Sequence, residues 1–412
     1  MQTMHPNDGF SQEKIFIIQP GEGKMAHDLE KEAVSLIESA GALHAGTVFQ
    51  AVRTIHPATY IGSGKLSELR ERLSGLEITV LFNGDLTPSQ TLNISAALDD
   101  RKVIDRTTLI LDIFAKNAKS SEGKLQVELA QLEYMYPRLK GKGSALSRLG
   151  GGIGTRGPGE TKLETDRRRI RTRIHYLENR LEEVKSRRKL FNEHRKKSEA
   201  NTVALIGYTN TGKSTLLNAL TEANVLAENK LFATLDPTTR KIVVDGSEFL
   251  LTDTVGFLRE LPHNLISAFE STLESALECD LALIVCDATD DYEMQLKTTL
   301  QILQDLDCQA PYRIVINKSE SMKNFDAFPP GSLFISAKTG SGLDRLKYEI
   351  LHFFQAEYSS VRLRIPYAKM GEYSRLRQFC TEISSEYTDQ FLEVLAKVSA
   401  RNLPKFSQFR TA

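Results

Sequence analysis

Gly207-Tyr208-Thr209-Asn210-Thr211-Gly212-Lys213-Ser214-Thr215 is the stretch that decides the fold, since it matches the pattern GxxxxGK[ST]. It follows the strand-like run TVALI directly and opens the helical run STLLNALT. Two glycines let backbone N–H groups wrap a phosphate chain, and a helix N-terminus adds positive potential. Lys213 can then reach the β- and γ-phosphate oxygens, and Ser214 can ligate Mg²⁺. The stretch therefore predicts a P-loop, and with it a nucleoside triphosphate site.

Four further short segments follow the P-loop in chain order, and three of them directly follow strand-like runs. The carboxyl ends of parallel strands form the crevice where open α/β sheets bind ligands. Five ordered segments are far more specific than any one alone. The four are Phe232-Ala233-Thr234-Leu235-Asp236, Asp253-Thr254-Val255-Gly256, Asn317-Lys318-Ser319-Glu320 and Ser336-Ala337-Lys338.

Three of these residues can complete the reaction centre. The Thr234 hydroxyl can join Ser214 as a Mg²⁺ ligand and touch the γ-phosphate, whereas the Asp253 carboxylate lies behind the metal's direct ligands. The Gly256 N–H points at the γ-phosphate. We therefore predict that Lys213, Thr234 and Gly256 act in catalysis.

Two positions depart from the usual guanine-nucleotide pattern. The base-reading motif NKxD ends here in Glu320, whose carboxylate has the same acceptors on a stem one methylene longer. Guanine, with two donors on its reading edge, stays better matched than adenine. Phe257 occupies the place of the glutamine that orients the attacking water in Ras-like enzymes, so hydrolysis by the isolated chain should be slow. An alternative is that Phe257 only packs beneath a following helix, on Ile266, Phe269 and Leu273.

Composition limits the remaining possibilities. The chain has 412 residues, of which 41% are hydrophobic and 26% charged, so it should form several globular domains. It shows no signal-peptide order and no apolar run long enough for a membrane span. The four cysteines form no CxxC pair, which argues against zinc and disulfide frameworks and favours the reducing cytoplasm.

The alternation of patterns divides the chain into four parts. Residues 1–118 read as a small, mostly parallel α/β domain, with strands at 15–18, 47–52 and 78–82. Residues 119–198 read as an antiparallel helical hairpin, 199–358 as a doubly wound domain with one antiparallel edge pair, and 359–412 as a small appended domain. The hairpin's helices are joined by a Gly-rich stretch at 141–160, which holds eight of the 26 glycines and cannot be helical.

Positive charge gathers in the hairpin. Lys+Arg and Asp+Glu both number 53, yet residues 138–198 hold nineteen Lys/Arg against seven Asp/Glu. A solvated helix face normally mixes signs, so contact with nucleic-acid phosphates explains the excess better. Since no base-reading module is present, we expect recognition of RNA shape and backbone. The predicted RNA-binding residues are Arg148, Arg156, Lys162, Arg167, Arg168, Arg169, Arg171 and Arg173.

Taken together, these segments resemble the HflX family of ribosome-associated GTPases, within the Obg/HflX-like group. Besides the five nucleotide segments, the resemblance rests on four others, and it covers nearly the whole chain. They are PATYIGSGKLSEL (57–69), NGDLTPSQTLNI (83–94), VIDRTTLILDIFAKNAKSSEGKLQVELAQLEYMYPRL (103–139) and LSRLGGGIGTRGPGETKLETDRRRIRTRI (146–174).

The resemblance implies a cytoplasmic GTPase that uses Mg²⁺ and converts GTP to GDP. It further implies binding to the large (50S) ribosomal subunit and the 70S ribosome through rRNA, separation of stalled ribosomes into subunits, and hydrolysis stimulated by the ribosome. We expect a monomer. The alternative is a signalling switch whose basic hairpin touches anionic lipid, so a weak membrane association stays open. That reading calls for aromatic anchors, and the sequence has no Trp.

Overall fold

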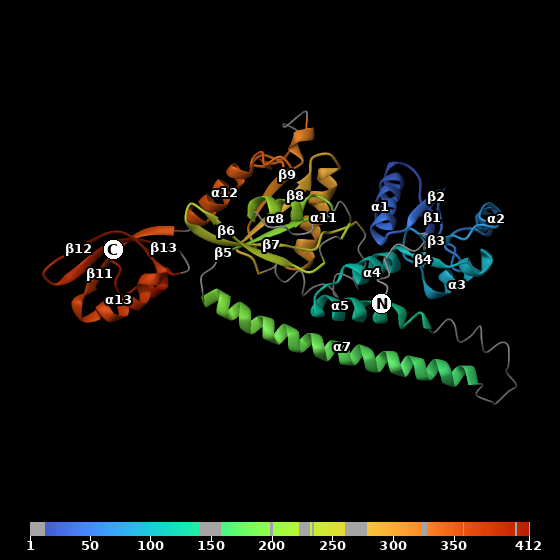
Figure 1. Ribbon diagram of the computed structural model, residues 1–412, viewed down its shortest axis with the longest axis horizontal. Coiled ribbons are helices and arrows are strands. Elements are labelled where there is room, and N and C mark those ends of the chain that lie inside the picture. The colour runs from blue at the N-terminus through green and yellow to red at the C-terminus, as the bar shows by residue number, and fades with distance from the viewer. Residues whose placement is uncertain are drawn as a thin grey trace, which may run out of the picture. The chain divides into compact units, whose positions relative to one another are not determined.

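The computed structural model describes residues 13–139, 158–197, 201–221, 231–232, 235–259, 278–322, 328–356, 358–399 and 402–411. These residues form three β-sheets (Figure 1). By their contacts they separate into two compact units. One unit comprises Met1–Ile242 and Leu250–Thr339, and the other comprises Val243–Phe249 and Gly340–Ala412.

The N-terminal sheet is parallel throughout, as the sequence predicts. Its order is β2 (Leu43–Gln50), β1 (Lys14–Pro20), β3 (Thr79–Phe82) and β4 (Val103–Asp105). β2 begins four residues before the predicted run, and the three-residue β4 has no pattern long enough to predict. The helices are α1 (Lys24–Ala40), α2 (Ser63–Arg72), α3 (Pro88–Ala97) and α4 (Arg106–Asn117).

Alternation along β1 gives this sheet two separate apolar faces. Ile15 and Ile17 pack with residues of α1 and α4, whereas Phe16 and Ile18 pack with residues of α2 and α3. Successive strand residues point to opposite faces, so one continuous apolar run serves both cores. The helices accordingly cover the sheet on both sides (Figure 1).

The predicted helical hairpin consists of α5 (Ser121–Met135) and α7 (Pro158–Lys197). The sequence predicts an apolar seam along the second helix at Ile170, Ile174, Leu177, Leu181 and Val184, spaced 4, 3, 4 and 3 residues apart. Leu177 is fully buried and the other four are half-buried, as this seam requires. Arg173 forms an ion pair with Glu128 across the two helices, with 2.7 Å between Nε and Oε1. The prediction that all of 141–160 is non-helical is wrong at its end, because α7 starts at Pro158, and proline suits a first helical turn.

α5 also has a second apolar face. Val127 and Ala130 belong to the same buried cluster as Ile110 and Phe114 of α4. The hairpin is therefore built into the N-terminal core through α5, and α7 contributes the outer helix.

Six runs between residues 201 and 356 predict strands, and the central sheet contains all of them: TVALI, KIVV, EFLLT, LALIVCD, YRIVI and SLFI. Its order is β10 (Leu333–Phe334), β9 (Tyr312–Asn317), β8 (Leu281–Asp287), β5 (Asn201–Gly207), β7 (Ser247–Asp253) and β6 (Thr238–Val244). β5, β8, β9 and β10 pair in parallel. Asp245 and Gly246, both with positive φ, join β6 to β7 in a two-residue turn, which makes that edge pair antiparallel. The helices described in this part of the chain are α8 (Lys213–Thr221), α11 (Tyr292–Asp305) and the short η1 (Ser319–Ser321).

The C-terminal unit carries a three-stranded antiparallel sheet in the order β11, β13, β12. Leu363, Val394 and Phe406 lie at the centre of its core. Its elements are α12 (Leu343–Ala356), β11 (Tyr358–Pro366), η2 (Tyr367–Lys369), α13 (Met370–Leu376), η3 (Arg377–Phe379), β12 (Thr381–Tyr387), β13 (Phe391–Ser399) and η4 (Leu403–Phe406). Across the described part of the chain, no helix combines the length and apolar character that a membrane span requires.

Candidate nucleotide site

The P-loop connects β5 to α8 at the carboxyl edge of the central sheet. Its second glycine, Gly212, has φ +90°, and a Cβ atom there would lie 2.3 Å from the Asn317 Nδ2 atom. Only glycine fits this place. The backbone can therefore pass close to Asn317 and turn its N–H groups toward one point, as a phosphate site requires.

Lys213 is buried and held inside the loop. Its Nζ donates to the carbonyl oxygens of Tyr208 (2.6 Å) and Gly207 (3.1 Å). Burial lowers the pKa of Lys213 to about 8, against an opposing effect of the Asp253 carboxylate. Phosphate oxygens beside the ammonium group favour its charged form, so the buried lysine is suited to an anionic ligand.

Oxygen donors lie together next to the lysine. The Ser214 hydroxyl donates to Asp253 Oδ2 at 2.6 Å, and the Thr254 hydroxyl fixes the end of β7 by donating to the Leu205 carbonyl at 2.7 Å. Hard oxygen ligands fit Mg²⁺, which usually takes few protein ligands and keeps water and phosphate around it. Within the described residues no group of three or more His, Cys, Asp or Glu side chains gathers as a metal site.

Asn317 joins three of the predicted segments. Its Nδ2 donates to the Thr211 carbonyl at 2.8 Å, and its Oδ1 accepts from the Ala337 N–H at 2.9 Å. Next to it, Lys318 Nζ donates to the Asn210 carbonyl at 3.2 Å and pairs with Asp287. Ser319 N–H donates to the Ile335 carbonyl at 3.1 Å, and the Ser336 hydroxyl accepts from the Thr339 N–H at 3.1 Å. The structure thus brings the P-loop, the end of β9 and the segment after β10 together.

Glu320 lies on η1, at the open side of this group, and is exposed. Lys318 just before it adopts a left-handed conformation, with φ 62°. Lys338 is also exposed. The Glu320 carboxylate is therefore free to move toward a base, and its longer stem is not fixed by packing.

Phe257 points away from the reaction centre. Its side chain is 2% exposed and belongs to the cluster that contains Ala204 and Ile284. Its backbone pairs with the P-loop, because its N–H donates to the Gly207 carbonyl (3.1 Å) and its carbonyl accepts from the Thr209 N–H (2.8 Å). The Phe257 side chain therefore packs in the core and, for the same reason, offers no group that could orient the attacking water. The residues 266, 269 and 273 of the alternative interpretation lie outside the described residues.

The segment around the predicted Mg²⁺ ligand Thr234 is held from both sides. Ala233 and Thr234 themselves lie outside the described residues. Before them, Leu231 N–H donates to the Ser39 hydroxyl and Asn117 Nδ2 donates to the Phe232 carbonyl, both at 2.8 Å. After them, Asp236 accepts from the Ser120 N–H at 2.8 Å and from the Lys119 N–H at 2.9 Å.

A buried network unforeseen in the sequence links the P-loop to α1 and α4, two of the helices that cover the N-terminal sheet. Arg106 pairs with Glu32, and their side chains are 4% and 10% exposed. Glu32 also accepts from the Tyr208 hydroxyl, which accepts from the Arg259 N–H at 2.8 Å. Burial and the Glu32 charge raise the pKa of Tyr208, so its hydroxyl stays protonated and able to donate. No local pattern marks residues 176 positions apart as partners.

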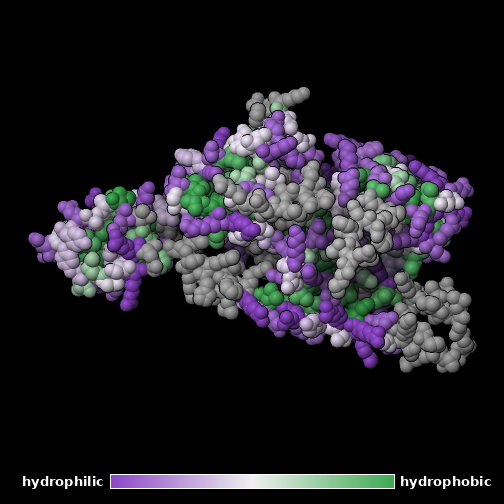
Figure 2. All heavy atoms as spheres, viewed as in Figure 1, coloured by the Kyte–Doolittle hydropathy of each residue, from purple (hydrophilic) through white to green (hydrophobic). Residues whose placement is uncertain are grey.

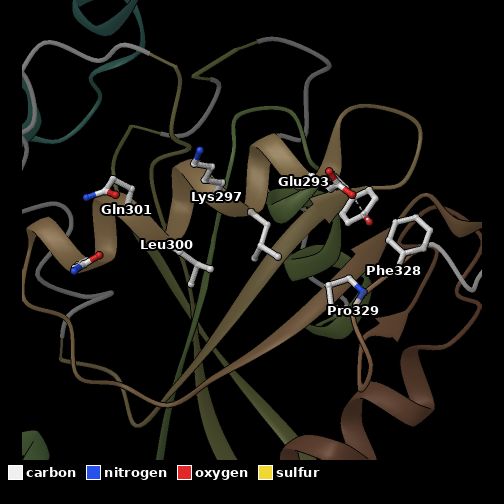
Figure 3. Close-up of a pocket in the computed structure, with 9 residues that line it drawn as sticks. Glu293, Lys297, Leu300, Gln301, Phe328 and Pro329 are labelled. Carbon is white, nitrogen blue, oxygen red and sulfur yellow. Dashed lines mark hydrogen bonds between the residues drawn. The ribbon is translucent and has the colours of Figure 1, made fainter.

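Among the hollows of the described residues, two lie in this part of the chain. A polar cleft of about 210 Å³ lies beside the P-loop and is lined by Thr209, Asn210, Glu32 and Arg259, among others. A groove of about 580 Å³ runs along α11, where the Tyr292 and Phe328 rings lie 4.3 Å apart (Figure 3). That groove contains no predicted site residue.

The predicted RNA-binding residues fall in two groups. Arg167, Arg168, Arg169, Arg171 and Arg173 all lie on α7, where Arg168, Arg169, Arg171 and Arg173 are exposed. Lys162 is also in α7, although its side chain is not described. Arg148 and Arg156 lie outside the described residues.

A doubly wound sheet with a P-loop after its first strand, an aspartate at the end of β7 and an Asn-Lys pair at the end of β9 defines a P-loop GTPase. Family models match in three parts: a GTP-binding GTPase N-terminal region at 27–115, a GTP-binding GTPase middle region at 117–195, and a 50S ribosome-binding GTPase at 202–318. Together with the relatives described next, these matches place the chain in the HflX family of GTPases.

Several curated relatives carry the name GTPase HflX, and two of them illustrate the match. The protein from Caldanaerobacter subterraneus is 46% identical over 95% of this chain and 92% of its own length. The protein from Lacrimispora saccharolytica is 43% identical over 93% of this chain and 92% of its own length. Among solved structures, the chain is similar to one titled "crystal structure of SsGBP and GDP complex", with 24% identity, coverage of 83% of this chain and 98% of the other, and a TM-score of 0.47.

We expect Lys213→Ala and Ser214→Ala each to abolish tight GTP binding in the purified protein. The first removes the buried cation that donates to the P-loop carbonyls, and the second removes the hydroxyl predicted to ligate Mg²⁺. Titration with a fluorescent GTP analogue measures the affinity, and circular dichroism checks the fold. Unchanged affinity in either variant would show that the nucleotide binds elsewhere.

We expect Glu320→Asp to tighten guanine binding and to keep the preference for GTP over ATP, because it restores the usual stem length. One poor hydrogen bond corresponds to about 1 to 3 kcal/mol, so the gain should be about tenfold. Competition binding with GTP, GDP and ATP measures the change in affinity and the nucleotide preference. A weaker affinity for GTP would mean that the loop is built around the longer glutamate.

Proposed function

We propose that this GTPase binds the 50S ribosomal subunit through rRNA in the cytoplasm and separates stalled ribosomes into subunits, with hydrolysis stimulated by the ribosome. The observation that carries the proposal is the exposed arginine surface of α7, on a hairpin whose inner helix is bonded to the loop flanking Thr234. The family model for residues 202–318 is described as a 50S ribosome-binding GTPase, which supports the choice of partner.

The nucleotide would lie along the P-loop, with its base near Asn317 and Glu320. Lys213 and the P-loop N–H groups bind the phosphates, while Ser214 and Thr234 would hold Mg²⁺ in front of Asp253. When bound, Mg²⁺ neutralises charge on the β- and γ-phosphate oxygens. The Gly256 N–H lies at the γ-phosphate end of this arrangement. The Ser214 hydroxyl fits such an ion, and the Asp253 carboxylate, which accepts a hydrogen bond from that hydroxyl, would lie behind it.

Slow intrinsic hydrolysis follows from the place of Phe257. A phenyl ring packed on the sheet can neither accept nor donate a hydrogen bond to the attacking water. A partner that orders the loops around the γ-phosphate can supply the missing alignment, as trans-acting groups do in other GTPases. The ribosome is the partner that the basic hairpin fits.

The cations of α7 suit phosphates spaced along an RNA backbone. Arg168, Arg169 and Arg171 project from one exposed stretch of the helix, and Figure 2 shows hydrophilic residues along its outer surface. Arg171 also donates to the Tyr136 hydroxyl at 2.6 Å, which orients its guanidinium group. Neutralised phosphates release counterions, so binding of this kind weakens steeply with salt.

Asp236 gives the nucleotide site a direct contact with the hairpin. It accepts two N–H groups at the start of α5 and also the Ser120 hydroxyl. Ser120 itself accepts from Gly123 N–H at 2.8 Å and so caps α5. A shift of the segment around Thr234 on nucleotide binding must therefore either move the start of α5 or break these bonds.

For the proposed function, we expect slow intrinsic hydrolysis that rises at least tenfold with 50S subunits or 70S ribosomes. Reversing Arg167, Arg168 and Arg169 to Glu should abolish that rise and flatten the salt dependence of ribosome binding, because the phosphate contacts are lost. Phosphate release and sucrose-gradient sedimentation measure the two effects. Flotation with anionic vesicles tests the lipid alternative.

The charge-matched control reverses Arg240, Arg345 and Arg362, three exposed cations that do not belong to α7. It should keep both stimulation and subunit separation. A triple α7 variant that still splits 70S particles would assign RNA contact to another surface.

We expect Asp236→Ala to uncouple ribosome binding by the hairpin from the state of the nucleotide site. The affinity for GDP should stay within about twofold of its normal value. The ratio of 50S affinities measured with a non-hydrolysable GTP analogue and with GDP should fall toward one, since allosteric coupling needs a contact that both ligands bias. Thr87→Ala is the matched control, because it removes a comparable helix cap from α3. An unchanged ratio in Asp236→Ala would exclude this contact as the coupling path.

A further inference from the structure

Thr209, Lys213 and Gly256 meet at one point of the P-loop. An ideal Cβ atom on Gly256 would lie 2.7 Å from the Thr209 Cα, 2.8 Å from the Thr209 Cγ2 and 2.9 Å from the Lys213 Nζ. The lysine and the glycine N–H are the groups that P-loop GTPases direct at the γ-phosphate. Thr209 therefore lies beside these two groups, with its Cγ2 methyl as the side-chain atom nearest to the Gly256 position, and the standard roles assign no function to its side chain.

The Thr209 hydroxyl is buried and unsatisfied. The residue is 6% exposed, and within the described residues its Oγ1 atom has no hydrogen-bond partner. The other P-loop threonine differs, because the Thr211 hydroxyl donates to the Tyr208 carbonyl at 3.0 Å. A buried hydroxyl without a partner destabilises a protein, so such a group calls for an explanation at this position.

The backbone around Thr209 is fixed, which leaves only the side chain to respond. Its N–H donates to the Phe257 carbonyl at 2.8 Å, and Phe257 N–H returns a bond to Gly207 at 3.1 Å. Phe257 contributes only its backbone here. A further side chain that contacts the γ-phosphoryl oxygens, besides Lys213, must therefore come from another residue. The hydroxyl of Thr209 is a donor without an acceptor, and those oxygens are acceptors.

We propose that the Thr209 hydroxyl donates a hydrogen bond to the γ-phosphoryl group of GTP and is a catalytic residue for hydrolysis. Water attacks the γ-phosphorus, the bond from that phosphorus to the β–γ bridging oxygen breaks, and GDP leaves with this oxygen. The water's proton passes to the phosphate that forms. Thr209 keeps its own proton and stabilises charge on the equatorial oxygens as the bond breaks. GDP has no γ-phosphate, so the contact is specific to GTP.

This inference rests on the nucleotide site proposed above, and the test separates the two. Thr209→Val keeps the shape and removes the hydroxyl, whereas Thr209→Ser keeps the hydroxyl. We expect Thr209→Val to lower the intrinsic hydrolysis rate and the affinity for GDP with fluoroaluminate at least about tenfold, the size expected for a hydrogen bond to a charged group. Its GDP affinity should stay unchanged, and Thr209→Ser should restore most of the rate.

Thr211→Val is the matched control, because its hydroxyl supports the loop itself. It should weaken GDP and GTP alike. Intact GDP affinity in Thr209→Val also shows that the variant is folded and that the nucleotide site is correctly placed. The proposal is overturned if Thr209→Val hydrolyses GTP at the normal or a faster rate, or if Thr209→Ser is as slow as Thr209→Val. If Thr209→Val does not fold, a normal affinity of Thr209→Ser for GDP with a tenfold lower rate also overturns it.

Discussion

The two hydrogen bonds of the Asn317 side chain are the constraint on which the nucleotide site depends. One amide side chain holds the P-loop carbonyl of Thr211 and the N–H of Ala337, and both atoms are buried. Because the amide presses on the loop, position 212 can only be glycine. The loops that follow three different strands are thus fixed by the same side chain. Without the Asn317 amide, the relative positions of these loops would no longer be fixed by these two hydrogen bonds.

A second constraint comes from the N-terminal sheet. The Arg106 and Glu32 pair is nearly removed from water, and ions in such places lose hydration that their attraction only partly offsets. The pair is satisfied further by Asn83, by Tyr208 and by the Arg259 carbonyl. The pair contributes mainly to the geometry of the site, because two charged side chains that each bind several fixed partners can adopt very few conformations. The P-loop and the segment after β7 are thereby held in one position relative to α1 and α4.

Much of the fold follows from the sequence because its signals are local. The six central strands, the P-loop and the two-residue turn at Asp245 and Gly246 each depend on neighbouring residues. The seam of α5 and α7 follows from the spacing of its leucines and isoleucines. β4 was not predicted, because three residues are too few to show a strand period. The predicted start of α7 lies after residue 160 instead of at Pro158, because glycines dominate the stretch before this proline.

The candidate site was predictable in part. Motif spacing identifies Lys213, Ser214, Asp253 and Asn317 as residues that belong together, and the structure brings them together. The bonds from Glu32, Ser39 and Asn117 to the P-loop and to the segment before Thr234 join residues more than a hundred positions apart. These hydrogen bonds depend on how whole helices and loops pack together, so no pattern in the sequence predicts them. The same holds for the unsatisfied hydroxyl of Thr209, since only packing shows which threonine lacks a partner.

The 40 residues of α7 form one helix, and this length has a mechanical consequence. At 1.5 Å per residue the helix is about 60 Å long, comparable to two small domains end to end. It ends at Lys197, and only three residues separate it from the first strand of the GTPase sheet. A tilt of about 5° at that end displaces the far end by about 5 Å, close to a full helical turn. A rigid helix of this length therefore amplifies a small rotation at one end into a displacement of several ångströms at the other.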